Sequence, residues 1–297
     1  MDIKAKAHLG LLGTNLFFAI NLSAVKYLTG NNFMQPFGMN VLRVGVSVIL
    51  FWVLFFLSPA ENKIQKEDLP RFILCAVTGI AINQMLFLKG LSLTYSIHAV
   101  LLMLTTPILI TIIAAWLLKE KTNAYKITGL GLGVSGAVVL IMARQNSGSG
   151  DDVLLGDLLI ITNAVSYTFY FILVKPLMLK YNPVQVIRWV FTFGLPMVLP
   201  FGWNEFTAIK WAGFGFTEYA CLSLIVIGGT FLAYLFNVYG IKVLGASVAG
   251  MYIYLQPLFA ATIAMIFLKE NLEAYKIFAA VLIFSGLYFS NKQTTRK

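Results

Sequence analysis

LKEKTNAYK, from Leu118 to Lys126, returns almost letter for letter as LKENLEAYK, from Leu268 to Lys276. Six of the nine residues agree, and the two copies lie 150 positions apart in a chain of 297 residues. The same offset pairs further residues along the chain: Pro107 with Pro257, and Ser135-Gly136 with Ser285-Gly286. A fixed offset that holds over such a distance indicates an internal duplication.

The composition indicates that the duplicated unit is built for lipid. The chain is 59% hydrophobic and 11% charged, whereas soluble domains are roughly 45–50% apolar and about 25% charged. Apolar runs close to the roughly 20 residues that cross a bilayer recur along its whole length. They predict an all-α, polytopic membrane protein with ten transmembrane helices, at residues 8–28, 36–57, 71–91, 95–118, 125–143, 154–175, 183–203, 217–240, 246–268 and 274–291.

Each half of the duplication contains five of these spans. Because five is an odd number, the second half enters the membrane with the opposite orientation, and the halves are therefore predicted to be inverted repeats. The first repeat is expected at residues 1–143 and the second at 154–297. The polar run NSGSGDD lies in the linker between them, residues 144–153.

The net charge of +10 is explained by the loops and not by nucleic-acid binding. If the N-terminus is cytoplasmic, the inside segments hold 14 Lys and Arg residues and the outside segments six, while Arg43 and Arg188 fall within spans. The positive-inside rule then predicts that both termini are cytoplasmic, in the plasma (cell inner) membrane. The expected partners are the lipid bilayer and a small-molecule substrate, without nucleic acid, and a monomer is the expected unit.

Four features together resemble the drug/metabolite transporter superfamily, and within it the EamA family of ten-helix exporters. They are the ten-span plan, the duplicated proline before a helix ending in Leu-Lys-Glu, the run FFAINLSAVKYL at 17–28 and the run GDLLIITNAVSYTFYFILVK at 156–175. The resemblance covers essentially the whole chain. It implies that spans 1–4 and 6–9 surround a central cavity, that spans 5 and 10 are peripheral, and that small metabolites are transported, often by export of amino acids or related compounds.

The chain departs from the family pattern at three positions. Lys119 and Lys269 stand where the Leu-Gly-Glu ending of the family has a small residue, and Phe18 stands where the first-span motif usually has Trp. The substrate of the family is therefore not carried over to this chain.

Polar residues at mid-helix are the candidates for substrate binding, because inverted repeats form their site near the membrane midplane. In the sixth span, Asn163, Ser166, Tyr167 and Tyr170 recur at i, i+3, i+4 and i+7 as one polar stripe. This stripe is expected to face the cavity, with hydrogen bonding between helices as the alternative. The candidates from spans 1, 3, 4, 8 and 9 are Asn15, Asn21, Asn83, Gln84, Lys89, His98, Thr105, Thr106, Tyr234, Asn237, Tyr252 and Gln256.

The charges near the membrane core are basic. All 12 Asp and Glu residues fall in loops or at helix ends, with Asp157 and Glu218 closest to the core. Such a cavity suits neutral, zwitterionic or anionic solutes better than cations. Arg43 and Arg188 are expected to be caps or snorkelling anchors near the interface. If they line the cavity together with Lys89, the alternative function is an anionic metabolite exchanger that resembles the nucleotide-sugar and sugar-phosphate transporters.

Other kinds of site find little support in the sequence. His98 is expected to make an interhelical hydrogen bond, with a proton relay as the alternative. GLGVSG at 131–136 fits a dinucleotide fingerprint, but within a span it indicates close helix packing instead. No metal-ligand cluster and no nucleophile with a base is recognised, so no metal, cofactor or enzymatic activity is expected.

The expected function is a secondary transporter that moves small organic metabolites, such as amino acids, outward by alternating access.

Overall fold

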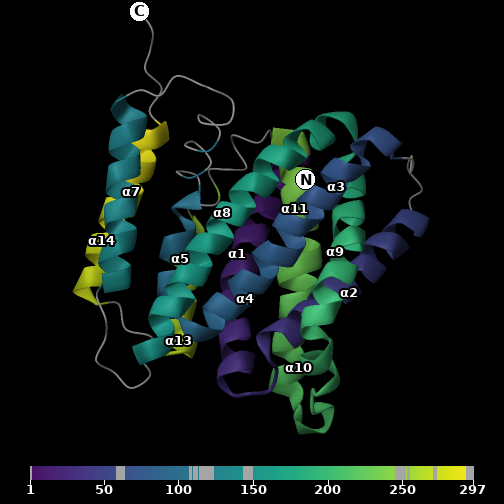
Figure 1. Cartoon of the computed structure of the whole chain (residues 1–297), viewed down its shortest axis with the longest axis horizontal. Helices are drawn as coiled ribbons and strands as arrows, with labels where there is room; N and C mark the ends of the chain where they lie inside the picture. Colours follow the sequence, from purple (N-terminus) through teal and green to yellow (C-terminus); the bar gives the residue numbers. More distant parts are fainter. Residues whose placement is uncertain are drawn as a thin grey trace, which may run out of the picture.

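The computed structural model of the protein describes residues 2–57, 64–106, 109, 113, 124–142, 150–244, 252, 255–269 and 273–291. Within these ranges the chain is helical and has no β-strand, which confirms the all-α fold. In chain order, the elements are α1 (Ile3–Gly30), α2 (Pro36–Leu57), η1 (Lys66–Asp68), α3 (Leu69–Ala76), η2 (Val77–Ile82), α4 (Asn83–Leu93), α5 (Ser96–Met103), α7 (Ala124–Met142), α8 (Gly150–Lys180), α9 (Pro183–Thr207), η3 (Trp211–Gly213), α10 (Phe216–Ser223), η4 (Leu224–Leu232), α11 (Ala233–Leu244), α13 (Gln256–Phe267) and α14 (Ala274–Asn291) (Figure 1).

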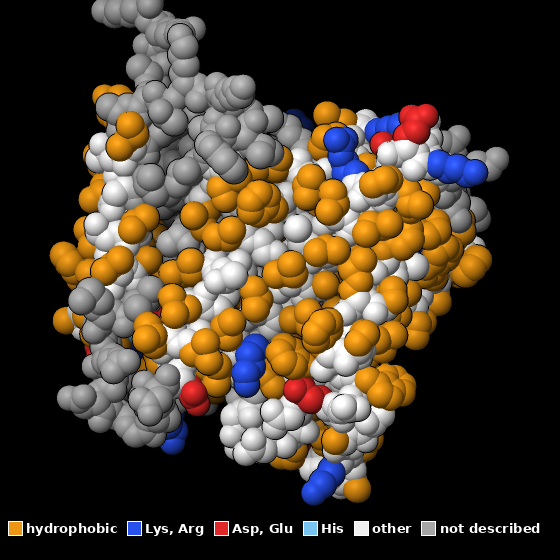
Figure 2. Space-filling view, viewed as in Figure 1, with side chains coloured by type: hydrophobic (Ala, Val, Ile, Leu, Met, Phe, Trp, Pro, Cys, Tyr) orange, Lys and Arg blue, Asp and Glu red, His pale blue; other side chains and the backbone are white. Residues whose placement is uncertain are grey.

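Six helical stretches of the described chain are long and apolar enough to cross a membrane. They are Ile3–Gly30, Pro36–Leu57, Lys66–Leu93, Asp152–Lys180, Val184–Thr207 and Phe216–Asn237. Figure 2 shows a broad apolar belt over the visible face, with most charged side chains toward the two ends of the molecule. A helix satisfies all its backbone hydrogen bonds internally, as lipid requires. The protein is therefore a multi-pass membrane protein.

The observed helix bounds differ from the expected ones in several places. The first helix begins at Ile3 instead of residue 8, and α8 begins at Gly150, inside the expected linker. Two aspartates follow Gly150 directly, and acidic residues stabilise the positive end of a helix dipole. Most of the expected fourth span beyond residue 106, and the part of the ninth before Leu255 apart from Tyr252, lie outside the described residues.

Two spans change from α-helix to π-helix near their centres. In the span 66–93 the π-helical segment is η2, and in the span 216–244 it is η4. Each segment contains a glycine where another helix approaches closely. A Cβ at Gly79 would lie 2.4 Å from Tyr170 Cδ2 of α8, and a Cβ at Gly229 would lie 2.7 Å from Asn21 Cβ of α1. Both positions therefore require glycine for the approach.

Helices of the first half of the chain pack mainly on helices of the second half. Helix α1 packs on η4 and α11, and α8 packs on η2 and α4. Other pairs between the halves include α1 with α13, α2 with α9, α5 with α13, and α7 with α14. In Figure 1, α7 and α14 stand together at one edge of the bundle, away from α2 and α9 at the other. The centre of the molecule is thus formed by both halves.

Glycines bring α7 and α14 into close contact, which agrees with the close helix packing expected for the stretch GLGVSG at 131–136. A Cβ at Gly286 of α14 would lie 2.7 Å from both the carbonyl oxygen of Gly129 and the amide nitrogen of Gly133 of α7. Backbone atoms cannot give way as a flexible side chain can. The interface is therefore a small-residue contact of the kind that membrane helices use.

We expect Gly286→Ala to destabilise the protein by about 1–3 kcal/mol, because the added methyl group overpacks the contact between α7 and α14. The measurement is the melting temperature of the detergent-solubilised protein, followed by size-exclusion chromatography after heating. Gly131→Ala is the matched control, since a Cβ at Gly131 would meet no described atom within 4 Å. Equal melting temperatures for the two variants would contradict this contact.

Candidate functional site

A buried arginine lies between α2 and the π-helical segment η4. Arg43 is 5% exposed, and its Nε donates a hydrogen bond of 3.1 Å to Thr230 Oγ1. The Thr230 hydroxyl in turn donates to the Ile225 carbonyl at 2.9 Å, five residues back in the π-helix. The expectation that Arg43 snorkels to the interface is therefore wrong. Its guanidinium reaches Thr230, near the centre of the span 216–244.

Several polar side chains around Arg43 are buried without a hydrogen-bond partner among the residues that the structure describes. They are Asn21 (Oδ1), Asn40 (both side-chain atoms), Arg43 (Nη1), Ser47 (Oγ) and Gln84 (both side-chain atoms), and we call these five residues the unpaired cluster. All five are at most 6% exposed. Most buried polar groups in proteins are hydrogen-bonded, and each one that is not requires an explanation.

Three tyrosines adjoin the unpaired cluster. Tyr234 of α11 lies beside Arg43 and Gln84, and its ring packs edge-on against Phe191 with a centroid distance of 5.4 Å. The rings of Tyr167 and Tyr170, on α8, are 5.7 Å apart and lie near Tyr234. The structure thus brings together Asn21, Gln84, Tyr167, Tyr170 and Tyr234, which the sequence placed on four separate spans.

The other half of the predicted stripe on α8 has a different surrounding. Asn163 donates from Nδ2 to the Asn83 carbonyl at 2.7 Å, and Asn83 donates from Nδ2 to the Asn163 carbonyl at 3.3 Å. Ser166 donates to the Thr78 carbonyl at 2.7 Å. These side chains join α8 to the interrupted span 66–93. For Asn163, Asn83 and Ser166 the structure therefore has the interhelical hydrogen bonds that were the alternative to a cavity position.

The remaining predicted residues lie elsewhere or bond within their own helix. Asn15 donates to the Leu11 carbonyl at 2.8 Å, and Thr105 to the Leu102 carbonyl at 2.6 Å. The Tyr252 hydroxyl lies 2.7 Å from Nδ1 of the exposed His8, near the start of α1 and away from the unpaired cluster. Lys89, Thr106, Asn237 and Gln256 are also partly buried.

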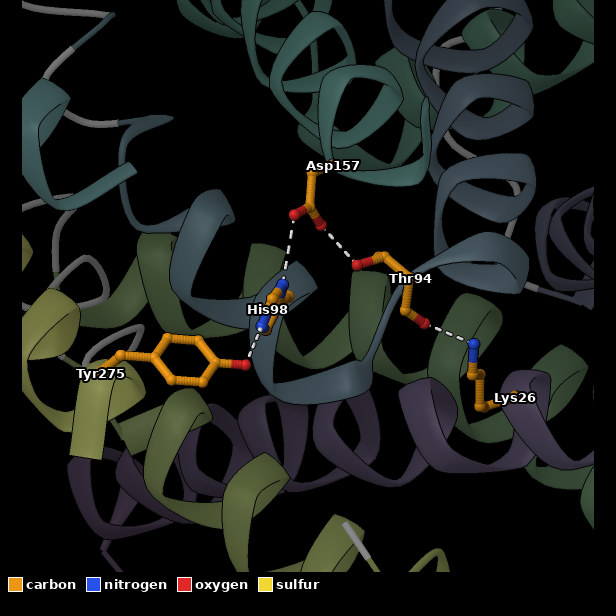
Figure 3. A network of polar contacts seen from close by, with 5 residues as sticks. All are labelled: Lys26, Thr94, His98, Asp157 and Tyr275. Carbon is orange, nitrogen blue, oxygen red and sulfur yellow. Dashed lines mark hydrogen bonds and ion pairs between the residues drawn. The ribbon is translucent and has the colours of Figure 1, made fainter. Parts of the chain in front are cut away.

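A second polar network is centred on His98 and Asp157 (Figure 3). Each residue is 1% exposed. His98 Nδ1 lies 3.2 Å from Asp157 Oδ2, and His98 Nε2 lies 3.2 Å from the Tyr275 hydroxyl. Asp157 also accepts a short hydrogen bond from the Thr94 hydroxyl. The expected interhelical hydrogen bond of His98 is present, but the sequence had not paired it with Asp157.

The network extends to two lysines that the sequence had placed in outer segments. Lys26 Nζ donates to the Leu91, Ser92 and Thr94 carbonyls, at the connection between α4 and α5. Lys276 is 1% exposed, and its Nζ lies 5.0 Å from the centre of the Tyr95 ring. The second copy of the repeated motif therefore anchors α14 to this network through Tyr275 and Lys276.

Arg188 is also buried, but in an aromatic environment. It is 3% exposed, and its guanidinium carbon lies 4.0 Å from the centre of the Phe55 ring and 4.8 Å from that of Trp52. These cation–π contacts hold α9 against α2. Arg188 therefore does not snorkel either, and it is not part of the unpaired cluster.

Most of the polar face of α2 was not among the predicted substrate-binding residues. Asn40, Arg43 and Ser47 recur at i, i+3 and i+7, which places them on one side of a helix. That spacing could have identified the stripe. Among the described residues, no group of three or more His, Cys, Asp or Glu side chains could hold a metal ion.

Comparisons with known proteins agree with this architecture. The uncharacterized transporter YoaV of Bacillus subtilis is 24% identical over 297 residues, covering 98% of this chain and 99% of that protein. A probable terminal-alkyne amino-acid exporter of Streptantibioticus cattleyicolor is 26% identical over 231 residues, covering 77% of this chain and 75% of that protein. A solved crystal structure aligns with a TM-score of 0.61 at 17% identity, covering 96% of this chain and 98% of the other, which supports the fold.

The EamA-like transporter family matches the chain twice, at residues 5–142 and 154–292. Together the two matches cover nearly all of the helical bundle described above. Transport across a membrane implies a small-molecule substrate and a lipid environment, which fits the apolar belt and the buried polar centre. The chain belongs to the EamA-like transporter family.

Proposed function

We propose that the protein exports small organic metabolites by alternating access between two inverted five-helix repeats, 1–143 and 154–297. The proposal is carried by three contacts of α1 with the second half of the chain, each of which has an equivalent contact of α8 with the first half. Thr14–Ala233 corresponds to Asn163–Asn83, Phe17–Gly228 corresponds to Ser166–Thr78, and Asn21–Gly229 corresponds to Tyr170–Gly79.

The register of these contacts supports the repeat relationship. Thr14 and Asn163 differ by 149 positions, and Asn83 and Ala233 differ by 150. The Thr14 hydroxyl lies 3.2 Å from the Ala233 carbonyl, as the Asn163 amide lies 2.7 Å from the Asn83 carbonyl. Inverted repeats face opposite sides of the membrane, so two equivalent helix contacts provide one closure for each side. Opening one contact while the other stays closed is alternating access.

The chemistry of the central residues supports neutral, zwitterionic or monoanionic solutes. The unpaired cluster contains one cation and no carboxylate, and cationic substrates would require an acid there. One relative is named as an amino-acid exporter, which supports amino acids as the substrate class. The anionic exchanger is less well supported, because Arg188 is stacked between aromatic rings instead of facing the cluster.

We also propose that the protein works in the plasma membrane with both termini in the cytoplasm. The distribution of 14 inside and six outside basic residues supports this orientation. A cysteine replacing Ser149, which lies outside the described residues, should then react with a membrane-impermeant thiol reagent in intact cells. Reaction only after cell lysis would reverse the orientation.

Transport itself can be tested in proteoliposomes loaded with a mixture of the standard L-amino acids and simple organic acids. We expect the efflux of at least one solute to exceed that from protein-free liposomes, measured by mass spectrometry of the external medium. Efflux should not require ATP, since a secondary transporter is driven by solute gradients. If no solute of the mixture leaves faster than from protein-free liposomes, the proposed substrate class is wrong.

A further inference from the structure

We propose that Arg43 binds the carboxylate of the transported solute, so that the substrates are monocarboxylates, above all zwitterionic amino acids. This inference rests on the proposed transport function and assigns a substrate group to one residue. It is carried by the burial of Arg43, its incomplete pairing, and the neutral polar groups around it.

Arg43 carries a positive charge in the interior of the helix bundle. Its guanidinium is buried between α2 and η4, and its hydrogen bond within the described chain is the one from Nε to Thr230. The ion pairs among described residues are His98 with Asp157 and Lys180 with Asp68, so none of them involves Arg43. A buried cation without a counter-ion is strongly unfavourable. A solute carboxylate would supply the missing negative charge.

One edge of the Arg43 guanidinium is fixed by its hydrogen bond to Thr230. Thr230 donates its own proton to the Ile225 carbonyl, so its oxygen is free to accept from Arg43 Nε. This contact holds one edge of the guanidinium in place. Nη1 is buried without a partner in the described part of the chain. A planar guanidinium held in this way is suited to binding a carboxylate with two parallel hydrogen bonds.

Amide and aromatic side chains near Arg43 can bind the remaining groups of the solute. Gln84 has a buried donor and a buried acceptor without partners among the described residues, and Asn21 has a buried acceptor oxygen. The rings of Tyr167 and Tyr170 lie near Tyr234, which adjoins both Arg43 and Gln84. Amide oxygens and aromatic faces bind an ammonium group without requiring a carboxylate. This set is complementary to an α-amino acid.

The melting temperature of a ligand-free Arg43 variant distinguishes a structural role of Arg43 from a role in binding a solute. If Arg43 served to join α2 to η4, removing it would lower the melting temperature of the ligand-free protein. If it serves a solute, Arg43→Gln removes an uncompensated buried charge, and the ligand-free variant should melt at or above the wild-type temperature. The sign of this change separates the two roles.

The binding experiment measures thermal shifts of the purified full-length protein with each standard L-amino acid and with its C-terminal amide. For wild-type protein, at least one acid should raise the melting temperature, and its amide should not. Arg43→Gln should lose this response, corresponding to a dissociation constant about 100-fold higher for one lost charged contact. Arg43→Lys should retain part of it, because a lysine keeps the charge without the planar pair of donors.

Arg188→Gln is the matched control, since it also removes a buried arginine. It should melt below wild type, having lost the contacts with Trp52 and Phe55, but it should still respond to the acid. The proposal is overturned if no acid shifts the wild-type protein, if the amide acts as well as the acid, if Arg43→Gln responds like wild type, or if Arg43→Gln alone melts well below wild type.

Efflux from proteoliposomes distinguishes this inference from the transport proposal. If wild-type protein and Arg43→Gln export the same solutes at equal rates, transport stands and the carboxylate role of Arg43 is wrong. If wild-type protein exports nothing from the mixture, the transport proposal fails as well.

Discussion

Asp157→Ala is expected to destabilise the protein by several kcal/mol, because each buried donor left without an acceptor costs about 1–3 kcal/mol. Asp157 is 1% exposed and interacts with both His98 and Thr94. Without it, the imidazole Nδ1 and the Thr94 hydroxyl remain in a low-dielectric interior with no acceptor. The melting temperature in detergent provides the measurement.

Asp152→Ala is the control for this prediction, because Asp152 is an exposed acid on the same helix, α8. Its removal should lower the stability by no more than about 1 kcal/mol, the usual effect of an exposed acid near a helix N-terminus. His98→Ala combined with Asp157→Ala should cost less than the sum of the two single changes, since the first change already removes the shared contact. Additive effects would show that the two side chains are not coupled.

The second large effect is a loss of transport without a loss of stability. Gln84→Leu should reduce solute efflux at least about tenfold, the effect of one lost hydrogen bond of about 1.4 kcal/mol. The same variant should melt at or above the wild-type temperature, because both side-chain atoms of Gln84 are buried without a partner in the described chain. Efflux and melting temperature are measured on the same preparations.

Asn163→Leu is expected to behave in the opposite way. Asn163 donates to the Asn83 carbonyl at 2.7 Å, so its replacement removes this hydrogen bond between helices and should lower the stability by about 1 kcal/mol. Efflux, corrected for the amount of folded protein, should change less than in Gln84→Leu. If the two variants lose transport equally at equal stability, the distinction between paired and unpaired side chains does not mark the site.

Much of this fold could be predicted from the sequence because lipid leaves a chain few choices. Apolar runs of sufficient length must be helices, and the fixed offset of 150 predicts an internal duplication. The π-helical segments could not be predicted. Glycines such as Gly79 and Gly229 mark a close approach, but they do not specify a change of hydrogen bonding from i+4 to i+5.

The candidate site could be predicted only in part, because periodicity identifies a face of a helix but not what the face meets. Tyr167 and Asn163 lie on one stripe of α8, yet Tyr167 adjoins the unpaired cluster while Asn163 bonds to a neighbouring backbone. His98 and Asp157 are 59 positions apart on helices α5 and α8, and no local pattern connects them. Such pairings depend on how the helices are assembled.

That assembly has a consequence for biosynthesis. Helix α1 packs mainly on α11, α13 and η4, and Gly30 and Ala233 are separated by about 200 residues of chain. At roughly 5–20 residues per second, α1 therefore emerges about 10–40 s before α11 is made. During this time the Thr14 hydroxyl can bond to the Gly10 carbonyl of its own helix, but Thr14 and Asn21 lack their contacts with Ala233 and Gly229. A chain that stops near the middle of its synthesis therefore leaves this face of α1 without the helices that cover it in the complete protein.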